Sequence, residues 1–167
     1  FREWREIRLS EVAQKNASGV NANSLSETPG VYPVFGASGI VGYVDFFLSQ
    51  NSHIGIVKDG AGVGRLFFCP PKSSVLGTLE SIVATGDNCT KFIYYWMSLI
   101  NFEAYTSGST IPHVYFRDYG QNKGLFPYPD EQRRITEFLS AIDAKITAVS
   151  EQVILIETFK KGLLQKM

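Results

Sequence analysis

Three groups of residues in this chain have types and spacings that could carry chemistry. The run from Asp59 to Gly64, with glycine at every second position, resembles a phosphate-binding loop. However, Arg65 stands where a dinucleotide motif needs its third glycine, and a strand rather than a helix is expected to follow. His53 and His113 have no pattern of carboxylates around them, so neither a metal site nor a Ser-His-Asp triad is indicated. Both histidines are better interpreted as ordinary structural residues than as catalytic ones.

A third group matches the letters of a metal-dependent nuclease motif. Pro129-Asp130 is followed by Asp143-Ala144-Lys145, which has the order Pro-Asp and then acid-x-Lys. Both pieces fall on one predicted helix, where helical rise would separate the two aspartates by about 20 Å. That distance is too long for one metal ion to bind both carboxylates. The chain also has no P-loop and no methyltransferase signature of the Asn-Pro-Pro-Tyr kind. The sequence therefore predicts no catalytic centre, metal or cofactor in this chain.

Composition places the chain among ordinary globular proteins. Of its 167 residues 44% are hydrophobic, enough for one core, and the net charge is zero because 16 basic residues balance 16 acidic ones. A neutral chain argues weakly against nucleic-acid binding, although net charge does not say where the cations lie. Cys69 and Cys89 do not suffice for a disulfide framework or a zinc site and suit a reducing cytoplasm. No apolar run of transmembrane length and no signal peptide is present, so we expect a cytoplasmic protein without a membrane partner.

The pattern of residues 1–128 predicts one α+β domain that is mostly β. Alternating apolar residues and Gly-rich turns at 36–39 and 59–64 indicate two hairpins, and 15–30 and 107–113 are polar loops. The segment from residue 90 is apolar on all sides and predicts a buried helix with Phe92, Tyr95, Trp96 and Leu99 on one face. The expected strands are Trp4–Leu9, Val31–Phe35, Ile40–Phe46, His53–Lys58 and Arg65–Cys69, and the expected helices are Ser10–Gln14 and Thr90–Phe102.

Residues 129–167 predict a second unit, a single long helix. Apolar side chains recur in alternating steps of four and three, interrupted at Lys160, which is the pattern of a coiled-coil seam. A helix cannot bury such a narrow stripe by itself, so a partner helix is expected; a plain amphipathic helix packed on its own domain is the alternative. The seam residues are Ile135, Leu139, Ile142, Ile146, Val149, Val153, Ile156 and Leu163.

Several segments, in this order and spacing, together resemble one known family. It is the specificity subunit of type I restriction-modification enzymes, and the resemblance covers essentially the whole chain. Single segments are weak signals, but the set is specific. The segments are Trp4–Val12, Tyr32–Tyr43, Lys58–Gly60, Glu131–Leu139, Ile142–Asp143 and Lys160–Met167.

The resemblance implies a non-catalytic DNA-recognition subunit. In that family a target recognition domain precedes a long helix, this unit usually occurs twice, and the two helices pack antiparallel so that each domain reads one half of an interrupted DNA site. The implied partners are double-stranded DNA, adenine methyltransferase subunits and restriction or translocase subunits. S-adenosylmethionine, ATP and magnesium would belong to those partner subunits. Phe138, Ile154 and Phe159, outside the seam, are possible docking residues for the methyltransferase.

This chain has one unit rather than two. It is therefore either a fragment of a longer subunit or a half-subunit that forms a homodimer, and a homodimer should read an interrupted palindrome. Two other interpretations remain open: the recognition module of a fused restriction-methylation enzyme, and a coiled-coil adaptor without DNA binding. The DNA sequence recognised does not follow from the chain.

Residues that read DNA are expected on loops held by a rigid scaffold. Each candidate also has a structural explanation, because Ser and Gly favour turns and Lys and Arg often end strands. The candidates for DNA binding are Ser38, Lys58, Arg65, Ser107, Ser109, His113 and Arg117.

Overall fold

The computed structural model describes residues 3–16, 19–25 and 30–165, and it has the mixed α+β architecture predicted, with a long C-terminal helix. The chain divides into two compact units, up to Gln132 and from Arg133 onward; we call the first unit the head. The strands are β1 (Arg5–Arg8), β2 (Ala13–Lys15), β3 (Tyr32–Gly36), β4 (Gly39–Val44), β5 (His53–Val57), β6 (Leu66–Cys69), β7 (Ser74–Val75), β8 (Leu79–Ala84) and β9 (Lys123–Phe126). The helices are α1 (Leu9–Val12), η1 (Ala22–Leu25), α2 (Thr90–Met97), η2 (Phe102–Tyr105), α3 (Phe116–Tyr119) and α4 (Pro129–Leu164).

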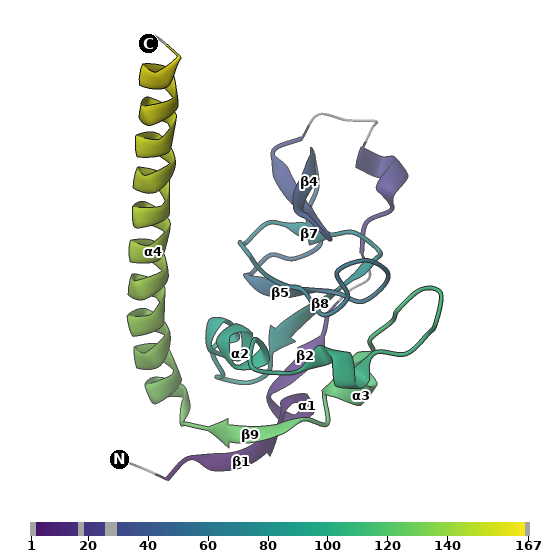
Figure 1. Cartoon of the computed structure of the whole chain (residues 1–167). Helices are drawn as coiled ribbons and strands as arrows, with labels where there is room; N and C mark the ends of the chain where they lie inside the picture. The colour runs from purple at the N-terminus through teal and green to yellow at the C-terminus, as the bar shows by residue number, and fades with distance from the viewer. Residues whose placement is uncertain (1–2, 17–18, 26–29, 166–167) are drawn as a thin grey trace. The chain divides into compact units, whose positions relative to one another are not determined.

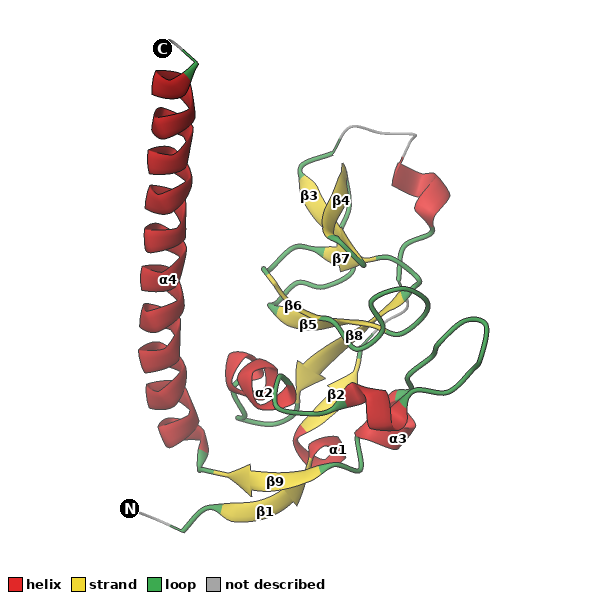
Figure 2. Cartoon of the chain, viewed as in Figure 1, coloured by secondary structure: helices red, strands yellow, loops and turns green. Residues whose placement is uncertain are grey.

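The centre of the head is an antiparallel sheet with strand order β2-β8-β5-β6 (Figures 1 and 2). All five residues of β5 are buried, so this strand is covered on both faces. Its middle residue is Gly55, where an added Cβ would lie 3.2 Å from the sulfur of Cys69 and 3.3 Å from Val75. The absence of a side chain at Gly55 therefore lets β7 pack closely on this face of the sheet.

Different layers cover the two faces of this sheet. Val57, Cys69, Val75 and Leu79 form one apolar cluster with Phe35 of β3. Successive side chains of a strand point to opposite faces, so Ile54 and Ile56 point away from that cluster, toward the face on which α2 packs. The order of layers is therefore α2, the four-stranded sheet, and the sheet that contains β3 and β7.

The second sheet has the order β4-β3-β7. Strands β3 and β4 form the predicted hairpin, with register from Tyr32 opposite Val44 to Gly36 opposite Gly39, whereas β7 joins β3 in parallel. A small core lies against the hairpin and contains Val20, Val34 and Val44. The hairpin is attached to the central sheet through Phe35, which packs with Val57 and Cys69 in the other cluster.

A ribbon of β1 and β9 brings the two ends of the head together (Figure 1). Near it, the indole N–H of Trp4 donates to Glu131 at 3.3 Å, and the guanidinium of Arg5 lies 4.7 Å from the ring centre of Tyr128.

Gln132, only 1% exposed, accepts from the backbone N–H of Cys89 at 2.9 Å. Its amide N–H groups donate to Asn88 at 2.9 Å and to the carbonyl of Pro127 at 3.0 Å. The first turn of α4 is thus hydrogen-bonded into the head, which its sequence pattern did not indicate.

The structure corrects several boundaries. The helix predicted over Thr90–Phe102 ends at Met97. Of its buried residues, Phe92 was on the predicted face, whereas Ile93 and Met97 were not. Leu99 lies beyond the helix and is 82% exposed, so its assignment to a buried face was wrong. Strands β2, β7, β8 and β9 were not predicted, and β2 replaces the last part of the helix predicted over Ser10–Gln14, although β8 lies inside the central sheet. Burial on both faces removes the polar–apolar alternation that would have revealed it.

The N-terminal assignments also need adjustment. The short helix predicted from Ser10 begins at Leu9, with Arg8 as N-cap, and the backbone N–H of Arg8 donates to Glu11 at 3.0 Å. Lys15, expected to open a polar loop, instead ends β2 and pairs with Glu80 at 2.8 Å. Residues 17–18 and 26–29 of that expected loop lie outside the described part of the chain.

The long C-terminal helix is confirmed as α4, which continues through Gly162 to Leu164; residues 166–167 lie outside the described part. The predicted seam splits into two parts. Ile135 and Leu139 are partly buried, whereas the later seam residues are exposed. The exposed seam residues are Ile142, Ile146, Val149, Val153, Ile156 and Leu163, with exposed fractions from 39% to 67%. Within the described residues no helix is long and apolar enough to cross a membrane.

His53 makes the stability of the head dependent on pH. Its ring is fully buried, its Nε2 has no hydrogen-bond partner among the described residues, and burial lowers its pKa below the usual 6.5. The unfolded chain therefore takes up the proton more readily than the folded chain. The free energy of unfolding should be undiminished above about pH 6.5 and should fall as the pH drops through that value toward the folded pKa.

We expect His53→Leu to remove this part of the pH dependence. Urea unfolding of the wild type and the variant between pH 7.5 and pH 5 measures it. Equal slopes of the unfolding free energy against pH for the two proteins would contradict the prediction.

Candidate nucleic-acid interface

Three polar loops of the head meet in one cluster, which we call the loop cluster: residues 36–39, 58–65 and 106–115. The second and third are joined by backbone bonds, because Gly60 N–H donates to the carbonyl of Pro112 and Val114 N–H donates to that of Lys58, both at 2.9 Å. The third loop also closes on itself, since Ser107 and His113 exchange two backbone hydrogen bonds of 2.9 and 2.7 Å. The structure therefore brings Lys58 close to the loop that carries Ser107 and His113, although about fifty positions separate Lys58 from them in the sequence.

The first loop is attached to the second through Arg65. Its guanidinium Nη1 donates to the carbonyl of Ala37 at 2.6 Å, in the turn that also contains Ser38. The side chains of Arg65 and Ser38 are both exposed. Two candidates that the sequence placed on separate hairpins therefore lie on adjacent turns.

Asp59 is a member of the loop cluster that the sequence analysis missed. One oxygen of its carboxylate lies 2.7 Å from His113 Nδ1, and the other lies 3.5 Å from the Lys58 ammonium. The ring of His113 also stacks on Tyr115, with the ring centres 6.2 Å apart and the planes at 17°. An aspartate before glycine is so common in turns that its sequence alone signals backbone geometry.

The glycines between Lys58 and Arg65 have structural roles. Gly60, Gly62 and Gly64 all have positive φ angles, between 82° and 86°, which residues with a side chain rarely adopt. An added Cβ would lie 2.6 Å from the Cβ of Phe102 at Gly64 but would contact nothing within 4 Å at Gly60. Turn geometry and close packing against η2 thus account for this run, in agreement with the rejection of a nucleotide loop.

Charge is unevenly distributed in the neutral chain. The loop cluster contains Lys58, Arg65 and the titratable His113, whereas Asp59 is its single carboxylate. That carboxylate is bonded to two of the three basic groups. The loop cluster therefore has a net positive charge, which is the sign that binding to phosphates requires.

The remaining candidates are Ser109 and Arg117, and within the described part of the chain no side-chain hydrogen bond joins either of them to the other candidates. Ser109 lies at the exposed tip of the third loop. Arg117, in α3, is 83% exposed and its guanidinium bonds Asp118 at 2.9 and 3.2 Å. That hydrogen bond from Arg117 lowers the pKa of the Asp118 carboxyl. Part of the charge of Arg117 is thus already compensated inside its own helix.

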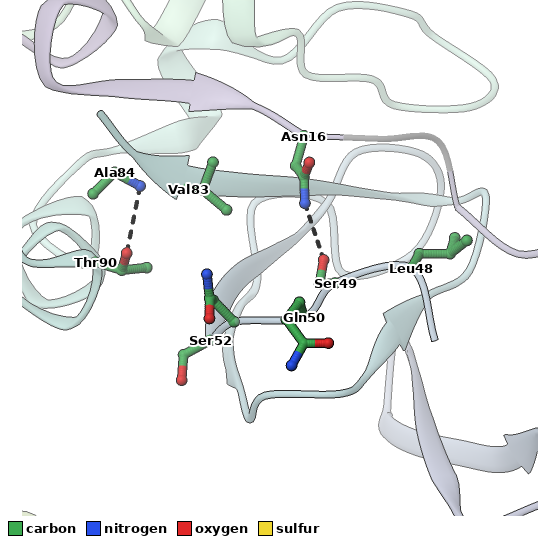
Figure 3. A pocket seen from close by; sticks show the side chains of 9 residues that line it. Asn16, Leu48, Ser49, Gln50, Ser52, Val83, Ala84 and Thr90 are labelled. Atoms are coloured by element: carbon green, nitrogen blue, oxygen red, sulfur yellow. Dashed lines mark hydrogen bonds between the residues drawn. The ribbon is translucent and has the colours of Figure 1, made fainter. Parts of the chain in front are cut away.

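A polar pocket of about 360 Å³ lies elsewhere in the head, where the end of β2, the loop before β5 and the start of α2 meet (Figure 3). Asn16 donates to Ser49 at 3.0 Å and the backbone N–H of Ala84 donates to Thr90 at 3.4 Å. None of the lining side chains carries a titratable group. The pocket therefore lacks the acid, base or activated nucleophile that catalysis would need, and the described residues contain no cluster of three or more potential metal ligands.

Comparison with known proteins agrees with this geometry. Residues 2–157 match the profile of the family described as type I restriction modification DNA specificity domain. The chain belongs to this family. It is also 26% identical over 127 residues to the type I restriction enzyme MjaVIII specificity subunit of Methanocaldococcus jannaschii. Membership in a DNA specificity family agrees with the prediction that residues 2–157 form a non-catalytic unit.

Solved structures of specificity subunits share the fold. The S subunit of the type I restriction-modification system from M. genitalium superimposes with a TM-score of 0.71 at 20% identity, over 89% of this chain and 41% of that one. The HsdS subunit from Thermoanaerobacter tengcongensis gives a TM-score of 0.59 at 18% identity, over 87% and 39%. A structure from a study of complex assembly in the type I R-M system gives a TM-score of 0.65 at 20% identity, over 89% of this chain and 40% of that one. The chain spans 29% of the length of its curated relative and about two fifths of the length of these solved chains.

Gly64 and Gly60 provide a matched test of how the loop cluster is held. Both have positive φ, so alanine at either position should cost about 1 kcal/mol in backbone strain. Gly64→Ala should cost about 2 kcal/mol more, because its methyl group overlaps Phe102. Urea unfolding of the two variants measures the difference. Equal losses of stability would show that the packing against Phe102 does not restrain this loop.

Proposed function

We propose that this chain is a DNA-recognition unit of a type I restriction-modification complex and reads one half of a bipartite site. The observation that carries the proposal is the loop cluster, in which donors and cations from three loops converge in a member of a DNA specificity family. Side-chain donors and acceptors on rigidly supported loops are what direct reading of base edges requires. Lys58 and Arg65 would contact phosphates or bases beside Ser38, Ser107 and His113, with Ser109 and Arg117 at the margin.

We further propose that α4 pairs with a second helix through its seam. Six seam residues remain between 39% and 67% exposed, and burying them against a partner would be favourable. An antiparallel pair would separate two recognition domains, each corresponding to residues 1–128, by a spacer formed from residues 129–167. The second helix would come from another copy of this chain or from a second unit of a longer subunit.

The proposal includes partner subunits in the cytoplasm. Adenine methyltransferase and restriction or translocase subunits would perform the chemistry and bind S-adenosylmethionine, ATP and magnesium. Phe138, Ile154 and Phe159 are exposed by 61% to 69% and lie outside the seam, so they could form docking surface for the methyltransferase.

Charge removal in the loop cluster tests the DNA contact. Lys58→Ala or Arg65→Ala should weaken binding to duplex DNA by about 1 kcal/mol or more, close to fivefold, and a lost phosphate contact should also make the salt dependence shallower. Lys123→Ala is the matched control, because Lys123 is on the β1–β9 ribbon and pairs with Glu6 at 3.5 Å. Fluorescence anisotropy over a salt series measures both quantities. Unchanged affinity and slope in both loop variants would remove these residues from the interface.

Helix length tests the spacer. Deleting Ala144–Ser150 removes one heptad and keeps the seam in phase, shortening the helix by about 10 Å. The spacer between half-sites should then shorten by up to about three base pairs, at roughly 3.4 Å each, while the half-sites stay unchanged. Selection of bound duplexes from a randomised library reads out both features.

Deleting only Ala144–Ile146 breaks the seam phase and serves as the control. It should reduce pairing, as measured by sedimentation equilibrium. A wild-type chain that stays monomeric at tens of micromolar, or a spacer that is unaltered by the heptad deletion, would contradict the proposed role of α4.

A further inference from the structure

We propose that Asp59 is a positioning residue that fixes the tautomer of His113, so that the exposed Nε2 of His113 reads an exocyclic amino group of adenine or cytosine. This inference rests on the proposed DNA-recognition function. It adds to that function a residue outside the predicted interface and the chemical identity of the group that is read.

The imidazole of His113 is restrained from several sides. Its Nδ1 lies 2.7 Å from Asp59 Oδ1, and its face stacks on Tyr115 at 17° between the planes. Backbone bonds from Gly60 to Pro112 and from Val114 to Lys58 hold the segments that carry Asp59 and His113 together. The ring therefore has a defined orientation before any ligand binds, which lowers the entropic cost of a specific contact.

The Asp59 contact selects one tautomer. A carboxylate can only accept hydrogen bonds, so a neutral imidazole bonded to it must carry its single N–H on Nδ1. Nε2 is then left with a free lone pair and acts as an acceptor. The side chain of His113 is 33% exposed, and its Nε2 bonds none of the described residues. Nε2 of His113 could donate or accept, depending on the tautomer. The bond from Nδ1 to Asp59 thus makes it a hydrogen-bond acceptor.

Asp59 itself would be unfavourable near DNA if it were bare. Its second oxygen lies 3.5 Å from the Lys58 ammonium, and the side chain of Asp59 is only 29% exposed. One carboxylate oxygen therefore accepts a hydrogen bond from His113, and the other lies near the positive charge of Lys58, while Nε2 of His113 bonds none of the described residues. A carboxylate in this arrangement is compatible with binding a polyanion.

An acceptor at this position would distinguish among base edges. In the major groove adenine presents an N6 amino donor and cytosine an N4 amino donor, whereas guanine O6 and N7 and thymine O4 are acceptors. A neutral His113 therefore favours adenine or cytosine.

Nitrogen NMR of the full chain tests the tautomer without DNA. The chain contains only two histidines, and His53→Leu assigns the signals of the other one. At pH 8 we expect long-range ¹H–¹⁵N correlations that show His113 protonated on Nδ1. Asp59→Ala should return the ring to the usual mixture dominated by Nε2–H, and Asp59→Asn should retain much of the Nδ1–H form because its amide oxygen can still accept. A wild-type His113 protonated on Nε2 would overturn the inference whatever the DNA result.

Selection from a randomised duplex library tests the reading of the base. With the wild-type chain at pH 8, one position in each half-site should require adenine or cytosine. Asp59→Ala and His113→Phe should both lose that preference, and affinity for the selected duplex should fall about tenfold, while other positions stay unchanged. Asp87→Ala is the matched control, an exposed carboxylate in the turn before α2.

The two proposals fail in different ways. If the wild type selects no motif, the proposed function fails. If it selects a motif that Asp59→Ala and His113→Phe both reproduce at full affinity, DNA recognition stands and the inference about His113 is wrong.

Discussion

The burial of β5 on both faces is the constraint on which the head depends. Gly55 allows β7 to approach one face, and α2 covers the other. Because this strand cannot shift without opening both layers, its end at Val57 is fixed in space. The loop that begins at Lys58 therefore leaves a rigid support, and the third loop is bonded to it through Gly60 and Val114. The geometry of the polar loop cluster follows from apolar packing beneath it.

Polar groups and exposed apolar side chains are concentrated in different units of the chain. The neutral chain places Lys58, Arg65 and His113 in one cluster around a single carboxylate, so the zero net charge of the chain does not describe the charge of this surface. The seam of α4 has the opposite character, with exposed Ile, Val and Leu side chains from Ile142 onward. One unit thus presents polar groups suited to a polyanion, and the other presents an apolar stripe suited to a helix. This division fits a recognition domain joined to a spacer.

Particular residues show how far the sequence could be read. The hairpin at 32–44 and the pair β5–β6 were predicted because their turns need glycine and their strands alternate or are continuously apolar. Strand β8 was missed because its neighbours bury it and remove the periodic signal. Gln132 was missed because a polar residue in a first helical turn normally faces solvent, whereas here three hydrogen bonds offset its burial. Asp59 was hidden by the ordinary use of Asp-Gly in turns.

By itself the sequence determined the α+β class, the long helix with its seam, the absence of a catalytic motif and the resemblance to a family that the comparison confirmed. These properties depend on local periodicity and on residues close together in the chain. Only the tertiary structure decided that Arg65 reaches Ala37 and that Asp59 meets His113, 54 positions away. Such pairings arise because β5 and its covering layers place distant loops side by side. Local propensity contains no information about contacts of that range, so the loop cluster became visible only once the chain was folded.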